Sequence, residues 1–343
     1  MRISSTLSGG DPCGISDNKL SKCIPPKGGI FSMNTSKLAE TILLVKPDHF
    51  GFNNETAGSN SFMKPMKNRS KSQVREKALD EFALMVRTLT SSDINVLVMK
   101  SREDRVTPDS VFPNNWFSTH PDGSIVLYPM LAYNRRDERQ PDKLKQLLSD
   151  SGFEVNTCMD WSHHEKEGLI LEGTGSIVFS KDYKVAFAMA SPRTDEKLFK
   201  KYCLYFGYEP VFFHAYDSFS KPVYHTNVIM AVGDGFAVLC SESIKDQTER
   251  TSVHSAIKKL GLERIDITLE QVSKFCGNII QLNSKSKRKK IVLSSNAFEG
   301  FTDLQKRRLE QYGSLVEVDI RTIEHVGGGS ARCMIAEIFL PKN

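Results

Sequence analysis

The sequence lacks the marks of disulfide-stapled, zinc-knuckle and membrane-spanning proteins. Its seven cysteines are an odd number, and no two of them form a C-x-x-C pair. This argues against a disulfide framework and a zinc knuckle, and it suits a reducing compartment. The chain has no run of about 18 apolar residues, and its N-terminus lacks the apolar core of a secretory signal. We therefore expect a protein that neither spans a membrane nor is exported, and a cytoplasmic location is favoured.

A strong charge of one sign is also missing. The chain carries 46 Lys and Arg against 41 Asp and Glu, a formal net charge of +5. This is mild for 343 residues, so we expect no nucleic-acid partner. The one basic run, at residues 285–290, lies between two apolar runs and is interpreted as a solvated loop. With 39% hydrophobic and 25% charged residues, the composition is that of an ordinary globular protein.

The first 36 residues differ from the rest of the chain. They are rich in Gly, Ser, Pro and Lys and show no periodic apolar pattern, so we predict a disordered leader over residues 1–36. Met33 falls just before the first patterned segment, so the leader could be an organellar transit segment, a start-site artefact or a tail without a role. It lacks the Arg-rich amphipathic pattern of a good transit peptide. Residues 37–343 are predicted to form a single domain.

In this domain, apolar runs of strand length alternate with helix-periodic segments. The predicted strands are residues 41–45, 95–99, 124–128, 169–171, 177–179, 185–189, 211–213, 227–232, 236–239, 278–282, 291–294 and 334–340. The predicted helices are residues 73–89, 141–149, 195–206, 247–260 and 302–312. Five helices divide the strands into about five packets, which favours a radial, propeller-like α/β arrangement. The rival is a doubly wound parallel sheet. Against it, the glycines at 327–329 lead into an alternating strand pattern and not into the helix of a phosphate loop.

Three chemically active side chains stand out against their apolar surroundings. Cys333 follows the glycine run at the start of a predicted strand, where the neighbouring Arg332 would favour a thiolate. His225 lies at the mouth of another apolar run. Taken singly, such a Cys or His is more often structural. Glu172 is a carboxylate inside an apolar run that breaks at glycines, and a charge in that place needs a partner.

Two further segments mix polar groups with aromatic or imidazole rings. The segment 109–117 combines Asp109 and Asn115 with large aromatic residues, which suits either a ligand pocket or a capped turn around a buried Trp. His163, His164 and Glu165 could suggest a metal site, but adjacent side chains point in different directions. We therefore expect no metal and no organic cofactor.

Glu172, His225 and Cys333 together supply an orienting carboxylate, a proton carrier and a nucleophile. Their order resembles that of the guanidino-group-modifying superfamily, whose members share the pentein fold, a five-bladed α/β propeller with pseudo-fivefold symmetry. The superfamily includes arginine deiminases, dimethylarginine hydrolases, succinylarginine dihydrolase and amidinotransferases. Over residues 38–341 the strings DSVFPNNWFSTH, LEGTGS, YHTNV, FCGN and GGGSARCM are most similar to those of citrulline-utilisation hydrolases.

The resemblance implies a role for each of these residues. It makes Cys333 the nucleophile, His225 the general acid and base, and Glu172 the carboxylate that orients the imidazole and contacts the substrate. It also places Asp109 and Asn115 against the planar head of the substrate.

In related enzymes arginines hold the carboxylate of the amino-acid substrate. The candidates in this chain lie in the segments YNRRDER and SPRTDE, and they are Arg135, Arg136 and Arg193. An arginine suits the task, because its planar fork meets a carboxylate with two hydrogen bonds.

Two departures bear on the substrate. Deiminases of the superfamily have aspartates where this chain has Asn115 and Asn227, and losing two carboxylates weakens the attraction for a cationic guanidinium. We therefore predict a cysteine hydrolase that cleaves a C–N bond at the planar carbon of a ureido or guanidino amino acid, with citrulline favoured. The alternatives are an amidinotransferase or arginine deiminase, and a non-catalytic module that binds an amino acid. The expected partner is a small amino-acid substrate, and the sequence leaves a homo-oligomer open.

Overall fold

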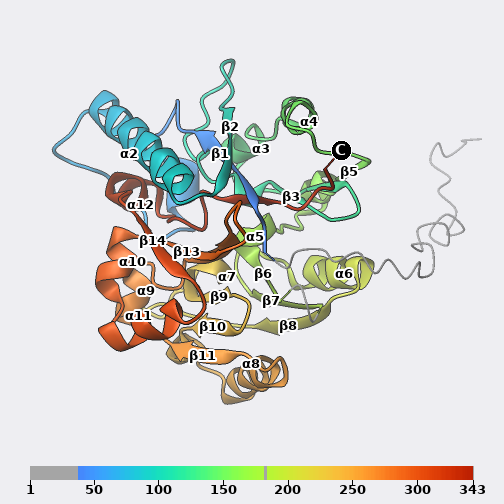
Figure 1. Ribbon diagram of the computed structural model, residues 1–343, viewed down its shortest axis with the longest axis vertical. Helices are drawn as coiled ribbons and strands as arrows, with labels where there is room; N and C mark the ends of the chain where they lie inside the picture. The colour runs from blue at the N-terminus through green and yellow to red at the C-terminus, as the bar shows by residue number, and fades with distance from the viewer. Residues whose placement is uncertain (1–37, 181–183, 343) are drawn as a thin grey trace, which may run out of the picture. The chain divides into compact units, whose positions relative to one another are not determined.

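The computed structural model describes residues 38–180 and 184–342 (Figure 1). The predicted leader lies outside these residues. Everything below concerns the compact unit Ser36–Asn343.

Within the described residues the strands form five three-stranded sheets of identical pattern. In each sheet the central strand pairs antiparallel with one neighbour and parallel with the other. The strand orders are β15-β1-β2, β3-β4-β5, β6-β7-β8, β9-β10-β11 and β12-β13-β14. The bounds are β1 Thr41–Lys46, β2 Asn95–Lys100, β3 Phe117–Thr119, β4 Ser124–Leu127, β5 Thr157–Asp160, β6 Ile177–Ser180, β7 Val185–Met189, β8 Glu209–Phe213, β9 Met230–Val232, β10 Phe236–Leu239, β11 Glu263–Asp266, β12 Ile280–Asn283, β13 Lys289–Ser294, β14 Ser314–Val318 and β15 Ala336–Ile338.

A helix connects the two parallel strands of every sheet, because a parallel pair needs a long crossover. These helices are α2 Lys71–Ser91, α4 Pro141–Asp150, α6 Glu196–Phe206, α8 Gln247–Lys259 and α11 Asp303–Glu310. They are the five helices predicted from periodicity, so the five-packet prediction is confirmed. The rival doubly wound sheet is wrong, because the strands divide among five separate sheets.

Shorter helical turns complete the described fold. They are α1 Asn54–Ala57, α3 Tyr133–Arg136, α5 Gly173–Ser176, α7 Thr226–Ile229, α9 Leu269–Ser273, α10 Ser295–Gly300, α12 Arg321–Gly327 and the 3-10 turns η2 Pro113–Asn115, η3 Ser162–Glu167 and η4 Ser241–Ser243. In the described part of the chain, none of the helices is long and apolar enough to span a bilayer.

Helix α2 shows why the sequence forms these elements. Ser70 and Gln73 make a reciprocal capping box at its start, which satisfies backbone N–H groups that the helix itself leaves unpaired. Its buried side chains recur at three- and four-residue spacing, so one apolar face packs inward. They are Val74, Ala78, Glu81, Phe82, Met85 and Leu89.

Both ends of the unit meet in the first sheet. Strand β15 pairs antiparallel with β1, with Thr41 opposite Ile338. Figure 1 shows the dark red C-terminal segment crossing beside the blue β1. The turn that carries Cys333 is thereby anchored to the start of the described chain.

Three predicted strands need correction. Residues 169–171 make only an isolated bridge from Leu171 to Thr194, and the run 227–232 begins as α7 before it becomes β9. The run 334–340 is a strand only at Ala336–Ile338, so Cys333 lies in a turn. Apolar character marks burial in each case, but burial alone does not distinguish a strand from a turn.

Candidate active site

The candidate site is built from the turns that precede the antiparallel strand of each sheet. Asn115 ends η2 before β3, Glu172 precedes α5 and β6, and His225 precedes α7 and β9. Cys333 lies in the turn before β15, and Asn278 occupies the same position before β12. Five sheets of one pattern thus each contribute a polar side chain from an equivalent place.

Glu172 and His225 form a buried hydrogen-bonded pair. The Oε2 atom of Glu172 lies 2.8 Å from Nε2 of His225, and the two residues are 0% and 1% exposed. The other carboxylate oxygen accepts the backbone N–H of Leu131 at 3.0 Å. Because the carboxylate holds the Nε2–H, the lone pair of the neutral imidazole is at Nδ1.

Two arginines keep Glu172 ionised. Nη1 of Arg193 and Nη1 of Arg135 lie 3.5 Å and 3.7 Å from its Oε2 atom. Burial alone would raise the pKa of Glu172, but Arg193, His225 and Arg135 together lower it below its ordinary value. Burial lowers the pKa of His225 to about 4, against the opposing effect of Glu172. Near neutral pH the pair is therefore a carboxylate and a neutral imidazole.

Gly175 in α5 packs against the side chains of both Asn115 and His225. A Cβ at Gly175 would lie 2.4 Å from Nδ2 of Asn115 and 2.7 Å from Nδ1 of His225. No side chain fits at these distances, so only glycine leaves room for the amide of Asn115 and the imidazole of His225 in these positions.

The sulfur of Cys333 receives hydrogen bonds from two amide side chains. Nδ2 of Asn278 lies 3.2 Å from Sγ, and Nδ2 of Asn227 lies 3.4 Å from it. Cys333 is 3% exposed. The Sγ–H group of Cys333 can also donate to Oδ1 of Asn227, which lies 3.8 Å away. The nearest polar side chains at the sulfur are therefore neutral amides and not a cation.

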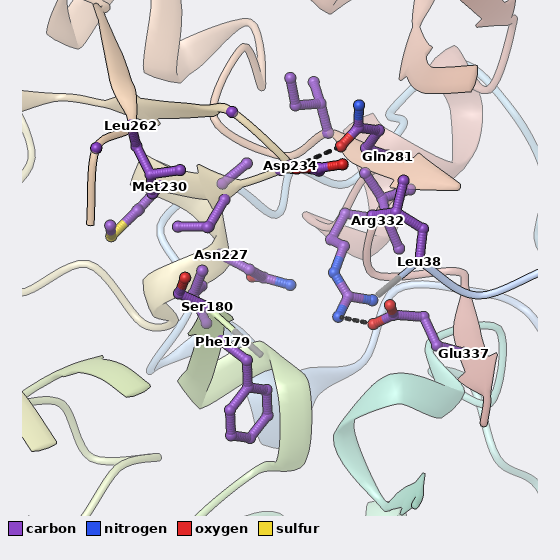
Figure 2. A pocket seen from close by; sticks show the side chains of 18 residues that line it. Leu38, Phe179, Ser180, Asn227, Met230, Asp234, Leu262, Gln281, Arg332 and Glu337 are labelled. Atoms are coloured by element: carbon purple, nitrogen blue, oxygen red, sulfur yellow. Dashed lines mark hydrogen bonds and ion pairs between the residues drawn. The ribbon is translucent and has the colours of Figure 1, made fainter. Parts of the chain in front are cut away.

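Arg332 faces a cavity of about 120 Å³, shown in Figure 2. Its guanidinium pairs with Glu337 at 3.1 Å and donates to the Ile335 carbonyl at 2.9 Å. Because a carboxylate already engages this guanidinium, it does not supply the free positive charge that the sequence suggested beside Cys333. Asn227 points into the same cavity (Figure 2), so the cavity reaches a direct neighbour of the sulfur.

Arg135 is held inside the protein. Its Nε and Nη2 atoms each donate to Glu138 at 2.9 Å, and Nη1 donates to Oδ1 of Asn115 at 2.8 Å. Nη2 also donates to the Phe112 carbonyl at 3.3 Å. These contacts use the donors of Arg135 and fix the amide plane of Asn115.

Arg193 makes fewer charged hydrogen bonds than Arg135. Its Nη2 donates to Oγ of Ser59 at 2.9 Å and to the Thr56 carbonyl at 3.3 Å, both neutral oxygens. The guanidinium also lies 5.2 Å from the ring centroid of Tyr224, within cation–π range. Arg193 is 3% exposed and faces Glu172, so it belongs to the interior of the site.

Arg136 lies nearer the surface, with its side chain 23% exposed. Its Nε donates to the Met130 carbonyl at 2.9 Å and lies 3.3 Å from Oε2 of Glu165. The guanidinium stacks 4.3 Å from the ring centroid of Tyr133.

Asp109 has one oxygen without a partner. Its Oδ2 accepts from Nδ2 of Asn53 at 2.8 Å and from Oγ1 of Thr56 at 3.0 Å. Its Oδ1 is buried and has no hydrogen-bond partner among the described residues. A buried acceptor left unpaired costs about 1–3 kcal/mol, so this oxygen is suited to a donor that a ligand brings.

The segment around α1 covers these groups. Thr56 and Ser59 contact Arg193, and Nδ2 of Asn60 donates to the carbonyl of Gly328 at 3.2 Å. Beneath this segment His225 and Cys333 are almost fully buried.

His163 and His164 are adjacent in η3. His163 contacts the Asp160 carbonyl and His164 contacts Glu167, so the two rings take different partners. Among the described residues no group of three or more His, Cys, Asp or Glu could hold a metal ion.

Sequence reasoning missed the contact of Asn278 with Cys333. An available signal was its place at the end of FCGN, directly before an apolar strand.

Comparisons with known proteins give one family match. The family model described as eukaryotic N,N-dimethylarginine dimethylhydrolase matches residues 46–340. A search of curated protein sequences returned no match.

Solved structures share the fold at low sequence identity. The apo structure of ArgZ, an arginine dihydrolase of the ornithine–ammonia cycle in cyanobacteria, aligns with a TM-score of 0.68 and 17% identity over 88% of this chain and 41% of that one. The N-terminal domain of ArgZ, a cysteine-to-serine mutant bound to substrate, aligns with a TM-score of 0.66 and 17% identity over 88% of this chain and 99% of that domain. DDAH from Pseudomonas aeruginosa, a cysteine-to-serine mutant complexed with citrulline, gives a TM-score of 0.57, 14% identity, and coverages of 88% and 99%.

These neighbours have the pentein fold, and the five sheets described above are its five blades. The present chain spans 41% of full-length ArgZ. With the family model matching most of its length, the chain belongs to the eukaryotic N,N-dimethylarginine dimethylhydrolase family, within the guanidino-group-modifying superfamily.

Proposed function

We propose that the protein is a cysteine hydrolase that cleaves the C–N bond between the ureido carbon and the side-chain nitrogen of citrulline. The observation that carries this proposal is the set of amides around the nucleophile. Asn227 and Asn278 contact Sγ of Cys333, and Asn115 meets His225 over Gly175. Amides both donate and accept, so they match a neutral ureido group better than a guanidinium, which only donates.

In this proposal Cys333 is the nucleophile and His225 transfers the protons. The sulfur attacks the ureido carbon while the neutral imidazole takes up the thiol proton, and the proton passes to the side-chain nitrogen as the C–N bond breaks. Ornithine leaves, and a carbamoyl group stays on sulfur. His225 then takes a proton from water, which attacks the carbamoyl carbon, and the C–S bond breaks to give carbamate and the thiol.

Glu172 supports both steps. Its carboxylate holds the Nε2–H of His225 at 2.8 Å, which fixes the tautomer and stabilises the imidazolium when it forms. Arg193 and Arg135 keep it ionised. In this scheme Glu172 accepts no proton itself.

Three of the sequence candidates are assigned to the substrate in this proposal: Arg193, Arg136 and Asp109. Arg193 binds neutral oxygens of Ser59 and Thr56, which a substrate carboxylate can replace with a stronger charged interaction. We assign the carboxylate to Arg193, with Arg136 as a second contact at the rim. Arg135 is not assigned to it, because Glu138 and Asn115 already use its donors. The free oxygen of Asp109 accepts an N–H of the substrate.

A guanidino substrate is the second candidate. Glu172 and Asp109 remain as carboxylates in the site, and they could attract a cation. The matching family acts on dimethylarginine by its description, and ArgZ is described as an arginine dihydrolase. Transfer of an amidino group to an amine differs from hydrolysis only in what resolves the covalent intermediate.

The test is to incubate the purified full chain with citrulline, arginine or dimethylarginine and to assay ornithine, citrulline and ammonia. We expect ornithine from citrulline, and no turnover in Cys333→Ser. Ornithine from citrulline that persists in Cys333→Ser would overturn the nucleophile assignment. Turnover of arginine or dimethylarginine without turnover of citrulline would overturn the assignment of citrulline as the substrate. Product that forms only when an amine acceptor is added would show that the enzyme is a transferase.

A further inference from the structure

Asn278 occupies a turn that is shaped to reach the nucleophile. Phe275 in the same turn has φ +61°, a left-handed conformation that is costly for a side chain other than glycine. A Cβ at Gly277 would lie 2.3 Å from the carbonyl oxygen of Val228, so this backbone packs directly onto α7. Strain and close packing together place the amide of Asn278 beside Cys333.

The amide of Asn278 contacts the nucleophile at two points. Its Nδ2 donates to Sγ of Cys333 at 3.2 Å, and its Oδ1 accepts the backbone N–H of Cys333 at 3.3 Å. Nδ2 also donates to the backbone carbonyl of Asn227 at 2.9 Å. Asn278 is 0% exposed, so water does not compete for these hydrogen bonds.

We propose that Asn278 is a catalytic residue, which stabilises the thiolate of Cys333 by donating a hydrogen bond to its sulfur. The assignment rests on the proposed function in one respect, that Cys333 is the nucleophile. Hydrogen bonds to an ionised group are stronger than those to a neutral group, so the donor favours the reactive thiolate over the thiol. With Arg332 engaged by Glu337, the amides of Asn278 and Asn227 are the donors that the described residues place on the sulfur.

The test measures the reactivity of the sulfur without substrate. The full chain is treated with iodoacetamide near neutral pH, and alkylation of the Cys333 peptide is followed by mass spectrometry in the range where the rate is proportional to reagent concentration. For Asn278→Ala we expect a rate about ten- to a hundredfold below wild type. Alkylation at the wild-type rate would overturn the proposal.

Asn278→Asp separates stabilisation of the thiolate from simple positioning. Aspartate has nearly the same shape and still accepts the backbone N–H of Cys333, but it replaces the donor at the sulfur with an anionic oxygen. We expect its alkylation to be at least as slow as that of Asn278→Ala. Recovery of the wild-type rate would show that Asn278 only holds the backbone. If Asn278→Ala does not fold, the alkylation rate of Asn278→Asp alone tests the proposal.

Gln281→Leu is the matched control. Gln281 lies three residues further along and is also a buried amide, but its partners are the Tyr312 carbonyl and the backbone N–H of Asp234. We expect unchanged alkylation of Cys333 in this variant, and an equal loss there would refute a specific role for Asn278. The readout needs no turnover, so a protein that does not hydrolyse citrulline but shows these rates would contradict the proposed function alone.

Discussion

At the scale of single residues, Asn115 tests the choice of substrate. Its Oδ1 is fixed toward Arg135, and one N–H is bound to Asn114 at 3.0 Å, which leaves one N–H and one lone pair for a ligand. In Asn115→Asp the N–H is lost, so a ureido oxygen loses a donor while a guanidinium gains an anion. We expect kcat/KM for citrulline relative to arginine to fall by one to two orders of magnitude, about 1–3 kcal/mol. An unchanged ratio would contradict the role of Asn115.

The ionisation of His225 gives a second residue-scale prediction. Burial lowers its pKa from the ordinary 6.5 to about 4, so the ring remains a neutral base until the pH approaches that value. We expect the acid limb of kcat/KM, which reports the free enzyme, to lie near 4. An acid limb near 6.5 would show that the ring ionises as an exposed histidine does.

The same shift affects stability. Between pH 6.5 and about 4 the unfolded chain binds the proton of His225 and the folded chain does not, so the free energy of unfolding decreases as the pH falls through this window. The slope of the thermal midpoint against pH in this window should be smaller in His225→Asn than in wild type. Identical slopes would remove His225 as the cause.

At the scale of elements, α5 sets the distance between two site residues. A Cβ at Gly175 would collide with Nδ2 of Asn115 and Nδ1 of His225, so Gly175→Ala must push the amide and the imidazole apart. We expect kcat to fall at least about a hundredfold, since small misplacements of catalytic groups have effects of this size. Gly51→Ala is the control, because a Cβ there meets nothing within 4 Å. A variant at Gly175 with wild-type kcat would contradict the geometry.

The elements also show where sequence analysis succeeds and fails. The five crossover helices are predicted because each carries an apolar face of helical period. The prediction misses the strands β3, β5, β11 and β14. Strands β5 and β11 are edge strands with mostly polar sequences, so their apolar signal is weak. Glu172 and His225 stand out as polar groups among apolar neighbours. Asn278 does not, because an asparagine in a turn is ordinary and its contact with Cys333 is created only by the fold.

At the scale of the whole molecule, the five-fold repetition of one sheet pattern explains how the candidate site residues come together. The candidate site residues are far apart in the chain, and they come together because the turns that carry them occupy equivalent places in five similar units. In the sequence this repetition is visible only as a pattern of strands and helices. The fold can therefore be predicted from the sequence, but the contacts between the five units cannot. The leader, the cytoplasmic location and a homo-oligomer remain predictions.

The boundary of the catalytic unit is a further whole-molecule prediction. We propose that residues 37–343 fold and act without the segment before them. A chain that begins at residue 37 should keep the thermal midpoint and the kcat of the full chain. A drop in either would show that the leader contributes to the folded enzyme.

The most direct test of the account is to identify the covalent intermediate. Wild-type protein is mixed with citrulline, quenched in the first turnover, and digested for mass spectrometry of the Cys333 peptide. The account predicts one carbamoyl group on Cys333, formed together with one equivalent of ornithine and absent in Cys333→Ser. Ornithine released without any adduct on Cys333, or an adduct on another residue, would contradict it.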